Sequence, residues 1–221
     1  MMTDNAFLDK GIVLGFCFPV DLHHRECKTY LQSGSMEYYL TGHVESIYGA
    51  KRREKIKAHR NAVLKHARYV DRNYNSEMGP MDLRDVRRHL DRGGNEARAY
   101  LKAYYDGKQF ANPADVVKDL REFARGMQSH VSERKEKFDE LVEPWTRKEE
   151  YPDLEDDLAS IRTDKEEDFW ICVDAHDLAE RTPGRTELAT TDVDDLANED
   201  RRELIVENTA IDSVEAVVFI G

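Results

Sequence analysis

Ala6-Phe7-Leu8-Asp9, near the start of the chain, is a short apolar run that ends at an acidic residue. A second short run, Glu187-Leu188-Ala189-Thr190, is followed after one residue by Asp192. Short runs of this kind are typical of buried strands. Open parallel sheets gather their ligands at the ends of such strands. The two runs therefore predict an α/β fold in which acidic side chains meet at the carboxyl edge of a parallel sheet.

Further strands and helices are expected on either side of these runs. The segment from residue 213 to 220 is almost filled by Val, Ala, Phe and Ile, as buried parallel strands tend to be. Thr41 is a plausible N-cap for a helix whose apolar periodicity continues to about Asn73. Another strand is expected at residues 37–40, and helices are expected at 11–17, 21–32, 168–179 and 196–208.

The middle of the chain has a different pattern. Between residues 75 and 165 apolar positions recur at helical spacing, β-branched runs are almost absent, and Gly and Pro residues divide the stretch. This predicts three or four helices and no strand that joins the main sheet. The expected organisation is an α/β unit at 1–74 and 166–221, with a helical insertion at 75–165.

Composition restricts the class of protein. The chain has 221 residues, a formal net charge of −12 and 35% charged residues, so bulk charge argues against nucleic-acid binding and any such contact must be local. Its three cysteines form no CxxC pair, which suits a reducing compartment. The longest apolar stretch, residues 12–20, is too short to cross a bilayer. We expect a cytoplasmic protein without membrane association.

Two more acids complete the candidate site. Glu45 follows the expected N-cap at Thr41, and Asp174 follows Ile171-Cys172-Val173. Four carboxylates at one edge repel each other unless a cation lies between them, and Mg²⁺ accepts such oxygen ligands and binds phosphates. Taken alone, an acid in so acidic a chain is more often a surface residue than a metal ligand. The arrangement of all four predicts metal-assisted phosphodiester chemistry.

The four acidic motifs resemble those of PIN-domain nucleases, whose best-known members are VapC-type toxins. Here they read Phe7-Leu8-Asp9, Val44-Glu45, Val173-Asp174-Ala175 and Ala189-Thr190-Thr191-Asp192. The spacing also matches the family, with 36 residues from the first acid to the second and 18 from the third to the fourth. The resemblance covers roughly residues 6–60 and 168–221.

The resemblance implies a parallel sheet flanked by helices and a site for Mg²⁺ or Mn²⁺. The ion would lower the pKa of a bound water for attack on RNA. Lys10-Gly11 depart from the family, which usually has a small hydroxyl residue and then Asn after the first Asp. A lysine there would compete with the cation. An antitoxin protein and a homodimer are further partners that the resemblance implies. The residues expected to hold the metal are Asp9, Glu45, Asp174 and Asp192, all four also catalytic, with Asp194 assisting.

A basic segment follows Glu45. Residues 51–72 hold nine lysines and arginines against two acids, a local contrast that can create a phosphate-binding face on a helix. The alternative is that these charges pair with the acids of the helical insertion at 75–165. We take the first interpretation, in which the RNA-binding residues are Lys51, Arg52, Arg53 and Lys55.

Three hypotheses for function remain open. The first is a metal-dependent endoribonuclease of PIN type, one form of which is the toxin of a toxin–antitoxin pair. The second is a catalytically weak PIN-like module that binds RNA or a protein partner, with Lys10 damping metal binding. The third is a different phosphotransfer fold with clustered acids. Stabilisation by Mg²⁺ or Mn²⁺ would separate the first two.

Overall fold

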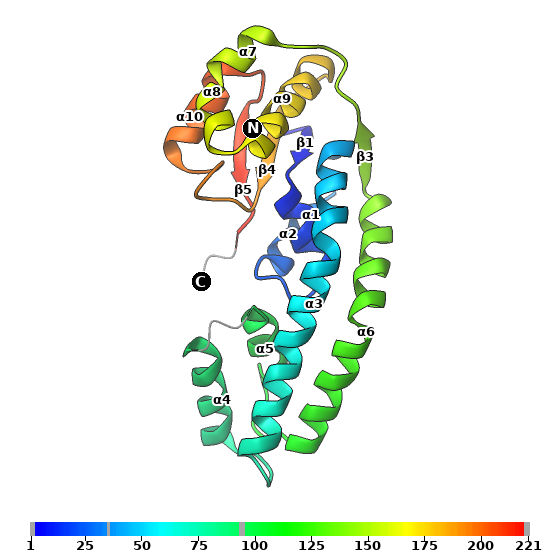
Figure 1. Ribbon diagram of the computed structural model, residues 1–221, viewed down its shortest axis with the longest axis vertical. Coiled ribbons are helices and arrows are strands. Elements are labelled where there is room, and N and C mark those ends of the chain that lie inside the picture. The colour runs from blue at the N-terminus through cyan, green and yellow to red at the C-terminus, as the bar shows by residue number, and fades with distance from the viewer. Residues whose placement is uncertain (1–2, 35, 93–95, 219–221) are drawn as a thin grey trace.

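The computed structural model describes residues 3–34, 36–92 and 96–218. The strands in these residues form one five-stranded sheet in the order β3-β2-β1-β4-β5, with every neighbouring pair parallel (Figure 1). The adjacent strands β1 (Asn5–Leu8) and β4 (Thr186–Thr190) are buried at every residue. The expected α/β class, a parallel sheet flanked by helices, is confirmed.

The N-terminal elements follow the hydrophobic pattern. Helix α1 (Lys10–Cys17) is apolar along most of its length and is buried from Ile12 onward. It is followed by α2 (His24–Leu31) and by β2 (Glu37–Thr41), which pairs with β1. Thr41 then takes the N-cap position of α3 (Gly42–Asn73), although its side chain makes no capping hydrogen bond. All four elements lie where the sequence predicts them.

The middle of the chain is largely helical, as expected, but it also supplies a strand. Helices α4 (Pro80–Arg92), α5 (Arg98–Tyr104) and α6 (Pro113–Asp139) are followed by β3 (Val142–Trp145), which pairs in parallel with β2. The prediction that no strand between residues 75 and 165 joins the sheet is therefore wrong. The strand lies at the sheet edge and is only half-buried at its two ends, so its sequence lacks an apolar run.

The chain then returns to the sheet. Helices α7 (Pro152–Asp157) and α8 (Ala159–Asp164) lead into α9 (Glu166–Arg181), which precedes β4. Helix α10 (Glu199–Asn208) connects β4 to the last strand, β5 (Ser213–Ala216). The strand expected at 213–220 is thus shorter than predicted, and the end of that prediction, residues 219–220, falls outside the described residues.

Two hydrophobic cores lie at opposite ends of the molecule (Figure 1). One surrounds the sheet, and the other joins α4 and α5 to the distant ends of α3 and α6. Because α3 and α6 pack along each other and belong to both cores, the two ends are continuous. The expected boundaries at 74 and 166 divide the chain differently, since half of α3 belongs to the helical end and β3 to the sheet. No described helix combines the length and apolarity needed to span a membrane.

Candidate metal centre

Asp9 stands at the carboxyl end of β1, beside the end of β4. The register pairs Leu8 with Ala189, and the Asp9 N–H donates to the Ala189 carbonyl at 3.0 Å. The Thr190 hydroxyl donates to Asp9 Oδ2 at 2.9 Å, whereas Oδ1 has no hydrogen-bond partner among the described residues. The side chain is only 1% exposed, and burial raises the pKa of the Asp9 carboxyl although Lys10 and Thr190 act against it.

The loop after β4 brings two more carboxylates to this edge. The Asp192 N–H donates to the Thr190 hydroxyl oxygen at 2.9 Å, so the same hydroxyl connects Asp9 with the loop. The Asp195 N–H in turn donates to Asp192 Oδ1 at 3.1 Å. Such short-range bonds from Asp side chains to the backbone fix tight turns. The turn places Asp192 and Asp195 side by side.

Asp168 completes the set from the first turn of α9. It is 1% exposed, and it has oxygens within 4.8 Å of those that Asp192 and Asp195 offer. Its Oδ1 accepts from Lys10 Nζ at 2.5 Å, while Oδ2 has no hydrogen-bond partner in the described part of the chain. A helix N-terminus favours negative charge. We call Asp9, Asp168, Asp192 and Asp195 the acidic cluster.

Two lysines neutralise part of this charge. Lys10 Nζ lies 3.8 Å from Asp9 Oδ1 and 3.2 Å from Glu167 Oε2, in addition to its bond to Asp168. Burial alone lowers the pKa of the Lys10 ammonium, but Asp9 and Asp168 outweigh it and raise that pKa above its ordinary value. Lys10 therefore stays protonated at neutral pH, in the position that a cation would take.

Lys165 closes the cluster from the solvent side. Its ammonium pairs with Asp195 and lies 3.4 Å from Asp192 Oδ2. The bond to Asp195 raises the pKa of Lys165, and the same bond holds the pKa of the Asp195 carboxyl below its ordinary value. The side chain is 45% exposed, so it can move aside more easily than Lys10, which is 12% exposed.

The acidic cluster is suited to a hard divalent cation. Asp168, Asp192 and Asp195 each offer one carboxylate oxygen within 4.8 Å of the others, and Asp9 is linked to them through Lys10 and Thr190. Two buried oxygens, Asp9 Oδ1 and Asp168 Oδ2, accept no hydrogen bond from the described residues, although Lys10 Nζ and Lys165 Nζ lie 3.8 Å and 3.9 Å from them. A buried polar group without a partner costs about 1–3 kcal/mol. Carboxylate oxygens are the ligands that Mg²⁺ and Mn²⁺ prefer. The donor set fits such an ion.

Gly11 allows the close packing at this edge. A Cβ at this position would lie 2.1 Å from Thr191 Oγ1 and 3.3 Å from Asp9 Oδ2. The first turn of α1 can approach the loop after β4 only because this residue has no side chain. The Lys10-Gly11 pair that departs from the PIN pattern therefore has a structural role in this chain.

Two of the four expected acids have other partners. Asp174 lies six residues after Asp168 on α9, about 9 Å further along the helix and on a different face. It pairs with Arg147 Nε at 3.2 Å, and burial raises its pKa although Arg147 acts against this. Glu45 pairs with Lys135 Nζ at 2.6 Å and lines a cavity with residues of β2, β3 and α6. No contact in the described residues brings either acid to Asp9.

The assisting acid is also a different one. Asp194 is exposed, and its neighbour Asp195 joins the acidic cluster instead. Of the acids that the sequence assigned to the site, Asp9 and Asp192 are in the cluster. The residues that sequence reasoning missed are Asp168 and Asp195. The available signal for Asp168 was its position at the start of the expected helix 168–179, where a carboxylate faces the sheet edge.

The four residues expected to bind RNA are mostly engaged within the chain. Lys51 Nζ lies 3.8 Å from Glu167 Oε2, and Lys55 Nζ lies 2.9 Å from Asp21 Oδ2. Arg52 Nη2 donates to Ser132 Oγ at 2.7 Å. Arg53 is exposed, with no ion pair in the described part of the chain. Both acids of these ion pairs lie outside residues 75–165, so Lys51 and Lys55 pair within the chain, but not with the insertion that the alternative named.

Comparison with known proteins identifies no relative. No protein-family model matches the chain, and neither the curated proteins nor the solved structures include a significant match.

Proposed function

We propose that the acidic cluster binds Mg²⁺ or Mn²⁺ and that the protein is a metal-dependent endoribonuclease of PIN type. The observation that carries this proposal is the group of neighbouring carboxylates of Asp168, Asp192 and Asp195, next to two buried oxygens, Asp9 Oδ1 and Asp168 Oδ2, that accept no hydrogen bond from the described residues. When bound, the ion would lower the pKa of a water and stabilise charge on phosphate oxygens. The residues that would hold it are Asp9, Asp168 and Asp192, with Asp195.

The protein's own groups prepare this site. Thr190 holds one oxygen of Asp9, so that the other is left for a ligand. Lys165 lies at the exposed side of the cluster, where its ammonium can contact an incoming phosphate once a metal takes its place between the carboxylates. RNA as substrate is supported by the resemblance of the motifs and by the basic segment on α3.

The test compares two acids on one helix. Asp168→Asn should abolish stabilisation by Mn²⁺ and Mn²⁺-dependent cleavage of single-stranded RNA, because it removes a buried carboxylate from the cluster. Asp174→Asn is the matched control and should retain both, since Asp174 pairs with Arg147 instead. Asp9→Asn should behave like Asp168→Asn. The readouts are thermal melting with Mn²⁺ or EDTA, and a cleavage assay in the same buffers.

The outcomes separate the two assignments. Loss of Mn²⁺ stabilisation in Asp174→Asn but not in Asp168→Asn would restore the motif-based ligand set and refute the cluster proposed above. Cleavage by wild type that persists in EDTA would refute the metal mechanism.

A second candidate function is favoured by Lys10. Its ammonium contacts Asp9, Asp168 and Glu167 at once, so it already supplies a positive charge where the metal would bind. On this second proposal the protein is a catalytically weak PIN-like module that binds RNA or a protein partner. Wild type would then show no Mn²⁺ stabilisation and no cleavage, and Lys10→Thr would gain both.

A further inference from the structure

The basic residues of α3 fall into two groups. Near the acidic cluster, Lys51 and Lys55 pair with carboxylates. Farther along the helix, Lys65, Arg68 and Arg72 are exposed, and no carboxylate lies within 4 Å of their charged groups in residues 3–34, 36–92 and 96–218. In a protein of net charge −12, three exposed cations without an acid partner on one helix form an uncompensated positive surface.

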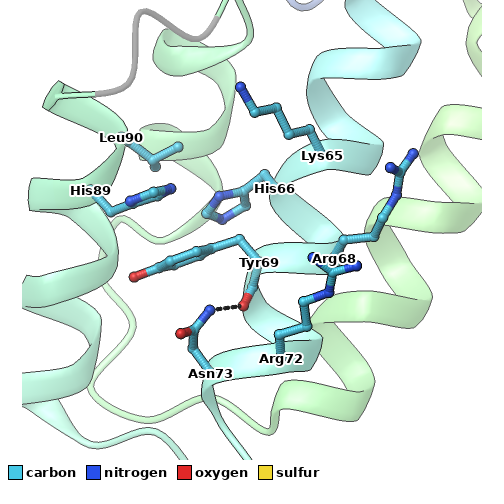
Figure 2. A pocket seen from close by; sticks show the side chains of 8 residues that line it. All are labelled: Lys65, His66, Arg68, Tyr69, Arg72, Asn73, His89 and Leu90. Atoms are coloured by element: carbon cyan, nitrogen blue, oxygen red, sulfur yellow. Dashed lines mark hydrogen bonds between the residues drawn. The ribbon is translucent and has the colours of Figure 1, made fainter.

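These three residues line one pocket between α3 and α4. The pocket has a volume of about 320 Å³, at the lower end of the range for small-ligand sites. Figure 2 shows Tyr69 and His89 lying flat against each other on one side, with Lys65 and Arg72 on α3 beside them. The two rings stack at 3.7 Å with an interplanar angle of 1°. No Asp or Glu is among the lining residues.

His66 adds a buried polar atom to the same pocket. The side chain is 2% exposed, its Nε2 pairs with the Tyr105 hydroxyl at 3.0 Å, and its Nδ1 has no hydrogen-bond partner among the described residues. Burial lowers the pKa of His66 to about 4, with His89 adding to the effect, so the ring is neutral at pH 7. When the Tyr105 hydroxyl donates to Nε2, the ring proton is on Nδ1, which then is a donor with no acceptor among the described residues.

Neighbouring acids are engaged elsewhere. Asp71, the acid nearest in sequence, pairs with Arg121 of α6 at 3.1 Å. Lys65, Arg68 and Arg72 have the helical spacing i, i+3 and i+7, which puts them on one face of α3. The pocket therefore combines three basic side chains, space for a ligand and a buried imidazole nitrogen that has no hydrogen-bond partner among the described residues. Phosphate is an anion that this set of donors recognises.

We propose that the pocket between α3 and α4 binds a backbone phosphate of RNA, which rests on the proposed function in taking RNA as the ligand. The exposed residues Arg53, Lys57 and Arg60 supply further positive charge along α3 between the pocket and the acidic cluster. Arg68 lies 17 residues after Lys51, or about 25 Å along the helix. A strand anchored in the pocket therefore follows α3 toward the acidic cluster, and the helical end of the molecule serves to hold substrate.

The test measures RNA binding without metal, so that it does not depend on cleavage. Fluorescence anisotropy of a labelled single-stranded RNA in EDTA compares wild type with the triple variant Lys65→Gln/Arg68→Gln/Arg72→Gln. We expect the triple variant to bind about tenfold or more weakly at low salt, and its log Kd against log salt slope to be smaller by about 0.7, because one phosphate contact is lost. Its melting temperature should stay within a few degrees of wild type, since all three side chains are exposed.

The matched control is Arg84→Gln/Lys118→Gln/Arg125→Gln, which removes the same charge from exposed positions of α4 and α6 outside the pocket. Equal weakening by both triple variants would overturn the pocket as a specific site, and so would RNA binding that is absent in wild type. Inorganic phosphate and AMP form a separate arm. If they bind wild type but not the pocket variant while RNA binds neither, the ligand is a small phosphate and the RNA assignment fails.

Failure of the proposed function has a different signature. If wild type binds RNA through the pocket but shows no Mn²⁺ stabilisation and no cleavage, the endoribonuclease proposal fails and the RNA pocket stands. If cleavage depends on Asp168 but the pocket variant binds RNA like wild type, the RNA pocket fails and the endoribonuclease proposal stands.

Discussion

Lys10 already supplies a positive charge to the acidic cluster, because its ammonium is held by Asp9, Asp168 and Glu167. Lys10→Met keeps the length of the side chain and removes the charge. In EDTA the variant should lose about 3 kcal/mol of unfolding free energy, since buried carboxylates are left unpaired. With Mn²⁺ it should be stabilised more than wild type. Urea unfolding in each buffer measures both effects.

The pH dependence has a definite sign. The pKa of Lys10 is raised in the folded protein, so its contribution to stability is complete below the ordinary lysine pKa of 10.5 and is lost only as the pH rises through the higher folded value. In EDTA the unfolding free energy of wild type should therefore exceed that of Lys10→Met throughout the neutral pH range. Lys165→Met is the control: its side chain is 45% exposed, and its loss should be below about 1 kcal/mol. Equal losses in the two variants would contradict the assignment.

Gly11 offers a steric test of the same edge. In Gly11→Ala the new methyl group would meet the Thr191 hydroxyl, so the loop that carries Asp192 must shift. We expect a loss of about 1–3 kcal/mol, as for overpacking in a well-packed region, and weaker Mn²⁺ binding by calorimetry. Gly49→Ala, on α3, meets nothing within 4 Å and should be neutral or stabilising by up to about 1 kcal/mol. Similar losses at the two glycines would show that close packing is not the cause.

Helix α9 holds the end of the edge strand β3 through Asp177. This fully buried carboxylate accepts hydrogen bonds from Trp145 Nε1 at 3.0 Å, the Lys148 N–H at 3.1 Å and the Tyr151 hydroxyl at 2.9 Å. It thereby fixes the segment between β3 and α7. Asp177→Asn should lower the unfolding free energy at pH 7 by about 2 kcal/mol, because bonds to a charged acceptor are weakened.

The same carboxylate predicts a pH effect. Burial acts to raise the pKa of Asp177, but the hydrogen bonds from Tyr151, Lys148 and Trp145 outweigh it, and the folded pKa lies below 3.8. Its contribution is therefore present above about pH 4 and is lost as the pH falls through the folded value. Below about pH 4, the difference in unfolding free energy between wild type and Asp177→Asn, measured by urea unfolding, should become smaller. Glu180→Gln, exposed on the same helix, should change little at any pH.

Strands that are buried on both sides could be predicted from the sequence, and the edge strand could not. Every residue of β1 and β4 is buried, so each leaves a short apolar run. In β3 the central Glu143 and Pro144 are exposed, and Pro is tolerated there because the strand is at the sheet edge. Its place is set by pairing with β2, which is a long-range property that local periodicity does not contain.

Half of the acidic cluster could be predicted from the sequence: Asp9 and Asp192 were expected there, and Asp168 and Asp195 were not. Asp9 and the loop with Asp192 follow strands that the sequence identifies, so both could be assigned to one edge. The choice between Asp168 and Asp174 depends on how α9 is rotated against the sheet, and motif spacing alone favoured Asp174. A turn after β4 brings Asp195, rather than Asp194, to the acidic cluster. The sequence between β4 and Asp195 does not predict that turn.

The whole molecule has two cores that share α3 and α6, so the sheet end and the helical end need not have equal stability. Val20, from the segment between α1 and α2, belongs to the helical core and connects it to the N-terminal elements. Leu101 of α5 is fully buried in that core, and Leu8 of β1 is fully buried in the other. A Leu→Ala substitution at one of these two positions therefore weakens one core at a time.

Leu101→Ala should cost about 2–5 kcal/mol locally, because it leaves a cavity. In native-state hydrogen exchange we expect protection to fall in α4 and α5 while β1 and β4 keep theirs, and Mn²⁺ should still stabilise the sheet. RNA binding in EDTA should weaken, since the pocket between α3 and α4 loses its support. Leu8→Ala should give the opposite pattern, with protection lost in β1 and β4 and no response to Mn²⁺. A uniform loss of protection in both variants would mean that α3 and α6 couple the two ends into one cooperative unit, and RNA and metal binding would then fail together.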